Sequence, residues 1–100
     1  MPTRPDTINT TVSTAGTQVQ IGTAGGGPIV EEFTFRPNVG ISGIIYVGAA
    51  DGSSSNGFPL SDGQSLVFTN SDGSPVDLSL YWIDASVNGE GGVSIFHRED

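Results

Sequence analysis

Cysteine and lysine are both absent from this sequence, and histidine occurs once. Without cysteine the chain has no disulfides, no thiolate metal sites and no thiol nucleophile. Basic residues are scarce, because three arginines stand against eleven carboxylates, and the formal net charge is −8. Nucleic acids and anionic membrane surfaces are bound through clustered lysine and arginine. The sequence therefore predicts neither a nucleic-acid partner nor a membrane partner.

Long hydrophobic runs are also absent. No apolar run approaches the roughly 20 residues of a transmembrane helix, and the start, MPTRPDT, lacks the hydrophobic segment of a signal peptide. We therefore expect a soluble protein that is made in the cytoplasm. A chain of 100 residues suits one domain, which we divide into an N-terminal extended arm or first strand at residues 1–16 and a β core at residues 17–100.

Alternation of apolar and polar residues is the clearest pattern present. Period 2 places Phe33 and Phe35 on one sheet face, and it places Leu66 and Phe68 inward with Val67 outward. The same reasoning puts Ile8, Thr10 and Val12 on one side of their strand. The segments predicted as strands are 8–13, 17–21, 31–36, 41–47, 65–69, 76–85 and 93–97. No segment has the room or the pattern for a helix.

Turn signals separate these segments. Asp-Gly and Asn-Gly pairs favour tight turns, because glycine adopts a positive φ cheaply, and they occur at residues 51–52, 56–57, 62–63, 72–73 and 88–89. The glycine-rich stretches 22–28 and 48–57 are predicted to be flexible loops. Short strands at regular spacing indicate an all-β, single-domain antiparallel β-sandwich or jelly roll of about seven strands, with a small barrel as the remaining topology.

Catalytic residues are difficult to find in this composition. A Ser-His-Asp triad would have to use His97, which lies near the end of the last predicted strand. Glu31 and Glu32 are adjacent, and adjacent strand positions face opposite sides of a sheet, so they cannot converge on one substrate. We expect a protein that is not an enzyme and has no catalytic residues.

Metal and cofactor motifs are equally incomplete. The loop at residues 51–57 begins like an EF-hand, but its glycine is at position seven and Asp62 stands where the bidentate glutamate belongs. Residues 70–73 are typical of a turn. GTAGGG is followed by Pro28 and a strand instead of the helix that a phosphate-binding loop needs. Asn9 starts a glycosylation sequon that matters only in a secretory pathway. We predict no metal and no cofactor.

Three aromatic residues, Tyr46, Tyr81 and Trp82, allow two interpretations. They would either line a carbohydrate platform or, as we favour, pack in the core or at a subunit interface. A continuous strand at 76–85 puts Leu78, Leu80 and Trp82 on one face and Tyr81 and Ile83 on the other. Such a strand needs cover on both faces, and another copy of the chain would supply the second cover.

Four ordered segments carry a resemblance. They are Ile45-Tyr46-Val47-Gly48, Asn56-Gly57-Phe58-Pro59-Leu60, Gly63-Gln64-Ser65-Leu66 and Leu80-Tyr81-Trp82-Ile83. This order resembles small β-rich virion proteins of tailed bacteriophages over roughly residues 41–97. The sequence departs from that pattern at Gln64, Trp82 and Asp84.

The resemblance implies a capsid cement or decoration protein, or a module of a head fibre or tail. A cement protein would bind the major capsid protein on the outer capsid surface of the virion as a homotrimer, which here would carry a charge of −24, three times −8. Acidity suits an outer surface better than a lining beside packaged DNA. The alternative is a receptor- or glycan-binding module of a phage fibre or adhesin.

Overall fold

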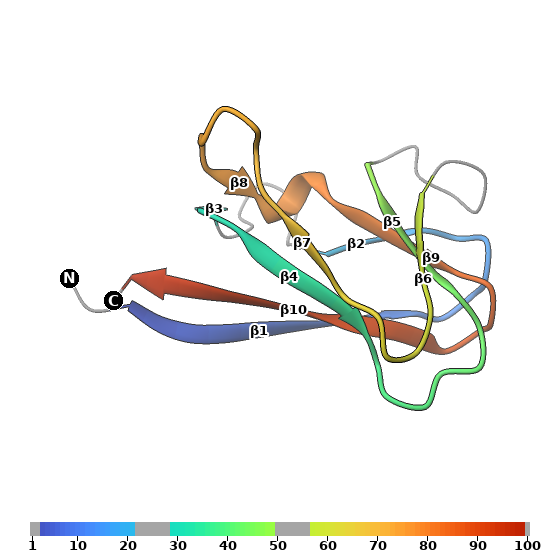
Figure 1. Cartoon of the computed structure of the whole chain (residues 1–100). Helices are drawn as coiled ribbons and strands as arrows, with labels where there is room; N and C mark the ends of the chain where they lie inside the picture. Colours follow the sequence, from blue (N-terminus) through green and yellow to red (C-terminus); the bar gives the residue numbers. More distant parts are fainter. Residues whose placement is uncertain (1–2, 22–28, 50–56, 100) are drawn as a thin grey trace.

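The protein is a β-sandwich of two four-stranded antiparallel sheets with a small two-stranded sheet beside them (Figure 1). The computed structural model describes residues 3–21, 29–49 and 57–99. Its elements are β1 (Thr3–Val12), β2 (Val19–Gln20), β3 (Ile29–Val30), β4 (Phe33–Pro37), β5 (Ile45–Gly48), β6 (Phe58–Leu60), β7 (Leu66–Phe68), β8 (Val76–Asp77), the 3-10 turn η1 (Leu78–Leu80), β9 (Trp82–Ala85) and β10 (Glu90–Glu99). The all-β class and the antiparallel sandwich are confirmed.

One sheet has the strand order β1-β10-β4-β7 and the other β2-β9-β5-β6, while β3 pairs with β8. The longest ladder joins β1 to β10 from Thr3↔Glu99 to Val12↔Glu90. Figure 1 shows these two strands, in blue and red, side by side with both chain ends at one end of the sandwich. Residues 3–12, which the sequence left open as an arm or a strand, are therefore a strand of the first sheet.

The core lies between the inner faces of the two sheets. Phe33 and Phe35 of β4 are buried, while Thr34 and Arg36 are only half-buried, as the alternation predicts. On β7, Leu66 and Phe68 pack against the core and Val67 is 52% exposed. The orientations predicted for both strands are confirmed. The other buried apolar residues are Val12, Ile21, Val30, Ile45, Val47, Leu60, Val76, Leu78, Ile83, Ala85 and Phe96.

The strand count differs from the prediction, because the described residues form ten strands and not about seven. The strand β6 was missed, since it is recognisable only by its partner β5. The strand expected after Pro28 is β3, which is short and separate from β4. The continuous strand predicted at 76–85 is wrong. Asp77 Oδ1 accepts hydrogen bonds from the Ser79 N–H at 2.9 Å and the Ser79 hydroxyl at 2.7 Å. This local capping competes with ladder pairing, and η1 divides β8 from β9.

Because of that division, the prediction that Leu78, Leu80 and Trp82 share one face of a strand is also wrong. Leu78 is fully buried, whereas Leu80 is 66% exposed, so the two leucines do not share a covered face with Trp82. The prediction that no segment forms a helix is confirmed for the described residues, whose one helical element is this three-residue 3-10 turn.

The glycine turns are confirmed where the structure describes them. Gly63, Gly73 and Gly89 have φ values of +86°, +79° and +80°, in the region that favours glycine. The turn signal at residues 51–52 lies outside the described residues, and the one at 56–57 lies partly outside them.

Glu90 anchors the long connection between β4 and β5. Its carboxylate accepts hydrogen bonds from the Ser42 N–H at 2.8 Å and the Gly43 N–H at 3.0 Å, and also from the Ser42 hydroxyl. The Ser42 N–H is the largest cause that lowers the pKa of Glu90 below its ordinary value of 4.5. Desolvation, which raises the pKa, is second, and the Gly43 N–H and the Ser42 hydroxyl lower it further.

Acid is therefore expected to weaken this anchor. Because the pKa of Glu90 is lower in the folded than in the unfolded chain, the stabilisation is complete above about pH 4.5 and is lost as the pH falls through the folded pKa. A Glu90→Gln variant should unfold at a lower temperature than the wild type near neutral pH, and this difference should shrink in acid. Thermal unfolding followed by circular dichroism across the pH range measures it. Glu32→Gln, at an exposed carboxylate, is the control. The prediction is contradicted if the difference in unfolding temperature between Glu90→Gln and the wild type does not change with pH.

Candidate functional site

The histidine and carboxylates that the sequence offered for chemistry remain apart. Among the residues that the structure describes, no group of three or more His, Asp or Glu side chains could hold a metal ion. His97 is exposed near the end of β10, and its register partner on β1 is Pro5. Glu31 and Glu32 are exposed in the short connection between β3 and β4. Nothing in these positions assembles a nucleophile with a general base.

The acidic loops behave as turns where they are described. The Gly73 N–H donates to the Asn70 carbonyl at 3.0 Å, so residues 70–73 form the predicted turn. The Ser74 hydroxyl and then the Ser74 N–H hold the pKa of Asp72 below its ordinary value. The calcium-like positions 51–56 and the glycine-rich stretch 22–28 lie outside the described residues.

Asp84 is a buried carboxylate. In the sequence it stood out only as a departure from the pattern of the phage virion proteins. It is 4% exposed, and its Oδ1 accepts hydrogen bonds from the Gly16 N–H at 3.0 Å and the Ala85 N–H at 2.8 Å. A second contact, from the Ala15 N–H to Asn88 Oδ1 at 2.7 Å, also holds this turn. Part of the outer face of β9 is therefore covered by the turn between β1 and β2 of the same chain. The sequence had suggested that another copy of the chain would supply this cover.

The three aromatic residues Tyr46, Tyr81 and Trp82 are divided between two surfaces. In the register of β5 with β9, Tyr46 pairs with Asp84 and Trp82 pairs with Gly48, which puts Tyr46 and Trp82 on the outer face of their sheet. Tyr81 points the other way and packs edge-on against Phe33 and Phe68, at ring-centroid distances of 5.0 and 5.3 Å. A single platform of all three is therefore ruled out, and packing explains Tyr81 better.

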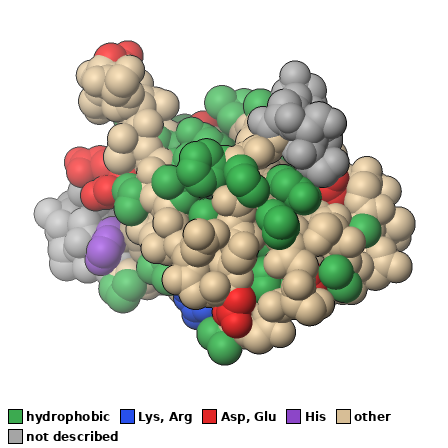
Figure 2. Space-filling view, turned by 45° about the vertical axis from the view of Figure 1, so that its right-hand side comes forward, with side chains coloured by type: hydrophobic (Ala, Val, Ile, Leu, Met, Phe, Trp, Pro, Cys, Tyr) green, Lys and Arg blue, Asp and Glu red, His purple; other side chains and the backbone are tan. Residues whose placement is uncertain are grey.

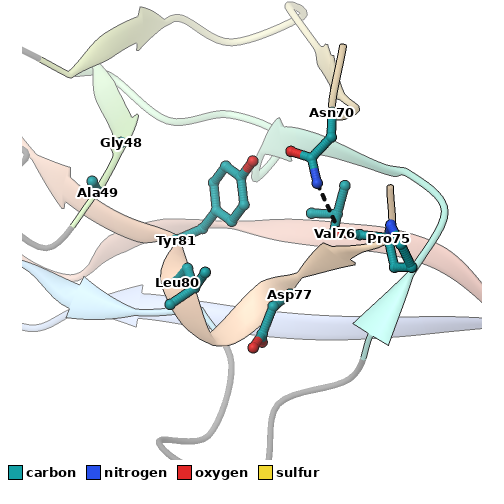
Figure 3. Close-up of a pocket in the computed structure, with 8 residues that line it drawn as sticks. All are labelled: Gly48, Ala49, Asn70, Pro75, Val76, Asp77, Leu80 and Tyr81. Atoms are coloured by element: carbon teal, nitrogen blue, oxygen red, sulfur yellow. Dashed lines mark hydrogen bonds between the residues drawn. The ribbon is translucent and has the colours of Figure 1, made fainter. Parts of the chain in front are cut away.

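A pocket of about 330 Å³ opens beside Tyr81, and we call it the end pocket (Figure 3). It lies where the end of β5, the β7–β8 turn and η1 meet. Its lining residues are Gly48, Ala49, Asn70, Pro75, Val76, Asp77, Leu80 and Tyr81. Sequence reasoning missed it, because these residues come from three separate segments, and no single motif unites them.

Asn70 is held rigidly at the rim of the end pocket. Its Nδ2 donates to the Pro75 carbonyl at 2.7 Å and to the Ser74 carbonyl and hydroxyl, both at 3.2 Å. With the amide nitrogen bound in this way, the orientation of Oδ1 is fixed. Figure 3 shows the Asn70 oxygen and the Tyr81 hydroxyl on the same side of the pocket.

The outer face of the first sheet has a different character. On the strands β1, β10, β4 and β7, no described side chain that faces outward is a carboxylate. One row across this face is Thr7, Ile95, Thr34 and Val67, and the next is Asn9, Val93 and Arg36. We call these seven residues the neutral face. Val93 and Ile95 are partly exposed at its centre.

Exposed apolar side chains are not confined to the neutral face. Figure 2 shows hydrophobic side chains gathered across the middle of one side of the molecule, with carboxylates at its margins. The large apolar residues with the most exposure are Ile29, Val39, Phe58, Val67, Leu80 and Val87. Phe58 and Val67 lie on β6 and β7, the strands at one edge of each main sheet.

The free edge of β1 is partly protected within the chain. Pro5 has no N–H to offer, and Asp6 Oδ1 accepts a hydrogen bond from the Thr7 N–H at 2.9 Å. A proline on an edge strand discourages the pairing of a further strand. A backbone N–H that is already bound by a side chain of its own strand is also not available to a new strand. The edge of β1 is therefore blunted at Pro5 and at Thr7, whose N–H is bound to Asp6.

Comparison with known proteins gives no relative. No protein-family model, no curated protein and no solved structure matches this chain significantly. In the described residues, no helix is long and apolar enough to cross a membrane.

Proposed function

We propose that this protein is a non-catalytic capsid cement or decoration protein of a bacteriophage, which self-associates as a homotrimer and binds the major capsid protein on the outer capsid surface. The sequence resemblance suggests this function, and the arrangement of three of its four segments supports it. Residues 45–48 form β5, residues 58–60 form β6 and residues 82–83 begin β9. These strands are neighbours in one sheet, in the order β9-β5-β6, so segments distant in sequence form one continuous structure.

The observation that carries the proposal is the neutral face. A chain with a net charge of −8 repels other copies of itself and other acidic surfaces. The electrostatic cost of contact is lowest where carboxylates are absent, and the neutral face offers apolar Val67, Val93 and Ile95 there. Arg36, which is half-buried, is the only charged residue within it.

A cement protein works by binding and has no need of catalysis. Each copy adds contacts to the junction between capsid subunits, and ligands that bind only the assembled state stabilise it by mass action. Repetition over a shell multiplies weak contacts through avidity. This role needs no metal ion, and no group of His, Asp or Glu side chains in the described residues could hold one.

Co-sedimentation with capsids tests the proposal. Purified protein is mixed with expanded capsids that lack it, from the phage that encodes this chain, and the bound fraction is measured after centrifugation. We expect the wild type to bind and Val67→Asp to bind at least about tenfold more weakly, a loss of roughly 1.4 kcal/mol, because it places a carboxylate on the neutral face.

Val39→Asp is the matched control, since Val39 is 83% exposed in the turn after β4 and outside the neutral face. If Val67→Asp and Val39→Asp bind equally well, the neutral face is not the surface that contacts the capsid. If the wild type stays in the supernatant, capsid binding itself is contradicted. Light scattering tests self-association separately, and a monomer at the highest soluble concentration would contradict the trimer.

A further inference from the structure

The end pocket has a rigid aromatic wall. The ring of Tyr81 packs edge-on against Phe33 and Phe68, and these two rings stack on each other at 4.9 Å with an angle of 18°. Aromatic contacts of this kind fix the orientation of the Tyr81 ring. Its hydroxyl remains directed into the space beside Asn70 (Figure 3). One side chain thus offers both an apolar surface and a group that can donate or accept a hydrogen bond.

Leu80, Pro75 and Val76 add apolar surface to the wall, and Asn70 adds a fixed acceptor at the rim. Leu80 is 66% exposed, Pro75 is exposed, and Gly48 has no side chain to fill the opening. Asn70 Nδ2 is already bound to the β7–β8 turn, so Oδ1 is an acceptor held in place before any ligand arrives. Pre-organised groups bind without a further loss of side-chain entropy.

The charge of the lining restricts the ligand. The end pocket has no arginine among its lining residues, and the chain has no lysine, so nothing there compensates an anion. The one carboxylate, on Asp77, is engaged by Ser79 and is directed away from Tyr81 and Asn70 in Figure 3. A cation therefore gains no direct ion pair beside Tyr81. The ligand that fits is uncharged, with an apolar face and several hydroxyl donors.

We propose that the end pocket is a binding site for an uncharged saccharide residue. The C–H face of the sugar ring packs on Tyr81 and Leu80, one sugar hydroxyl donates to Asn70 Oδ1, and a second exchanges a hydrogen bond with the Tyr81 hydroxyl. A volume of about 330 Å³ is at the small end of ligand pockets, which suits one or two sugar rings.

This site does not depend on capsid binding. The neutral face is the outer surface of the first sheet, whereas Tyr81 contacts Phe33 and Phe68, which lie on the inner side of that sheet. A chain attached through the neutral face would leave the end pocket open to solvent. The saccharide proposal can therefore fail while the capsid proposal stands, and the reverse also holds.

Titration of the ¹⁵N-labelled protein with single sugars tests the site by NMR. The probes are glucose, galactose, mannose, rhamnose and N-acetylglucosamine, with anionic sialic acid and cationic choline for comparison. We expect at least one neutral sugar to shift the amide signals of Gly48, Asn70, Leu80 and Tyr81. Tyr81→Phe keeps the ring and removes one hydrogen bond, so it should weaken binding about three- to tenfold.

Leu80→Ala should weaken binding as well, because it removes exposed apolar surface without opening the core. Phe58→Ala is the control, since Phe58 is 52% exposed and outside the lining, and its affinity should equal that of the wild type. The proposal is overturned if no neutral sugar shifts these signals at millimolar concentrations, if sialic acid or choline alone does so, or if Tyr81→Phe and Leu80→Ala bind as tightly as the wild type.

Discussion

Replacement of Gly91 by alanine is expected to destabilise the protein by about 3 kcal/mol or more. Gly91 is buried on β10 opposite Thr11 of β1. A Cβ atom at this position would lie 1.9 Å from the Thr10 carbonyl oxygen and 2.8 Å from the Thr11 Cα. Both are backbone atoms that cannot rotate away, so β1 would have to move out of its ladder with β10.

Thermal unfolding measures the effect. For a domain of this size a loss of about 3 kcal/mol corresponds to a fall in Tm of roughly 12–24 °C. Thr11→Ala is the control, because Thr11 is the exposed register partner of Gly91 and its substitution leaves the ladder intact. A Gly91→Ala protein that melts within a few degrees of the wild type would mean that the two strands lie further apart than described.

Phe33→Ala is expected to cost about 3–5 kcal/mol of unfolding free energy. Phe33 is 1% exposed, stacks on Phe68 and meets the ring of Tyr81 edge-on. The substitution removes a buried ring and leaves a cavity between the two sheets, and it also removes the support of Tyr81. A loss of this size is a large part of the roughly 5–15 kcal/mol that stabilises a typical domain.

Phe58→Ala provides a matched control for this prediction, because it is the same chemical change at a residue that is 52% exposed. Urea unfolding should show a large fall in midpoint for Phe33→Ala and a small one for Phe58→Ala. Near-UV circular dichroism should change only in the Phe33 variant, as Tyr81 loses its fixed environment. Equal midpoints would contradict the assignment of Phe33 to the core.

The candidate sites were much harder to predict than the fold. Tyr81 attracted attention as an aromatic residue, yet its surroundings depend on Phe33 and Phe68 from two other strands. Asn70 was interpreted as part of a turn, which is correct, but its role at the rim depends on where the end of β5 lies. The neutral face has no sequence signature, because each of its rows runs across strands that are not consecutive along the chain.

The sequence by itself determined the β class, the inward positions of Phe33, Phe35, Leu66 and Phe68, and the turns at Gly63 and Gly73. These follow from side-chain alternation and from backbone sterics, which act over a few residues. Only the tertiary structure decided that η1 interrupts the segment 76–85, that Asp84 is buried beneath the turn after β1, and that no described outward side chain of the first sheet is a carboxylate. Each of these depends on which strand lies beside which, and that pairing is set by contacts between residues far apart in the chain.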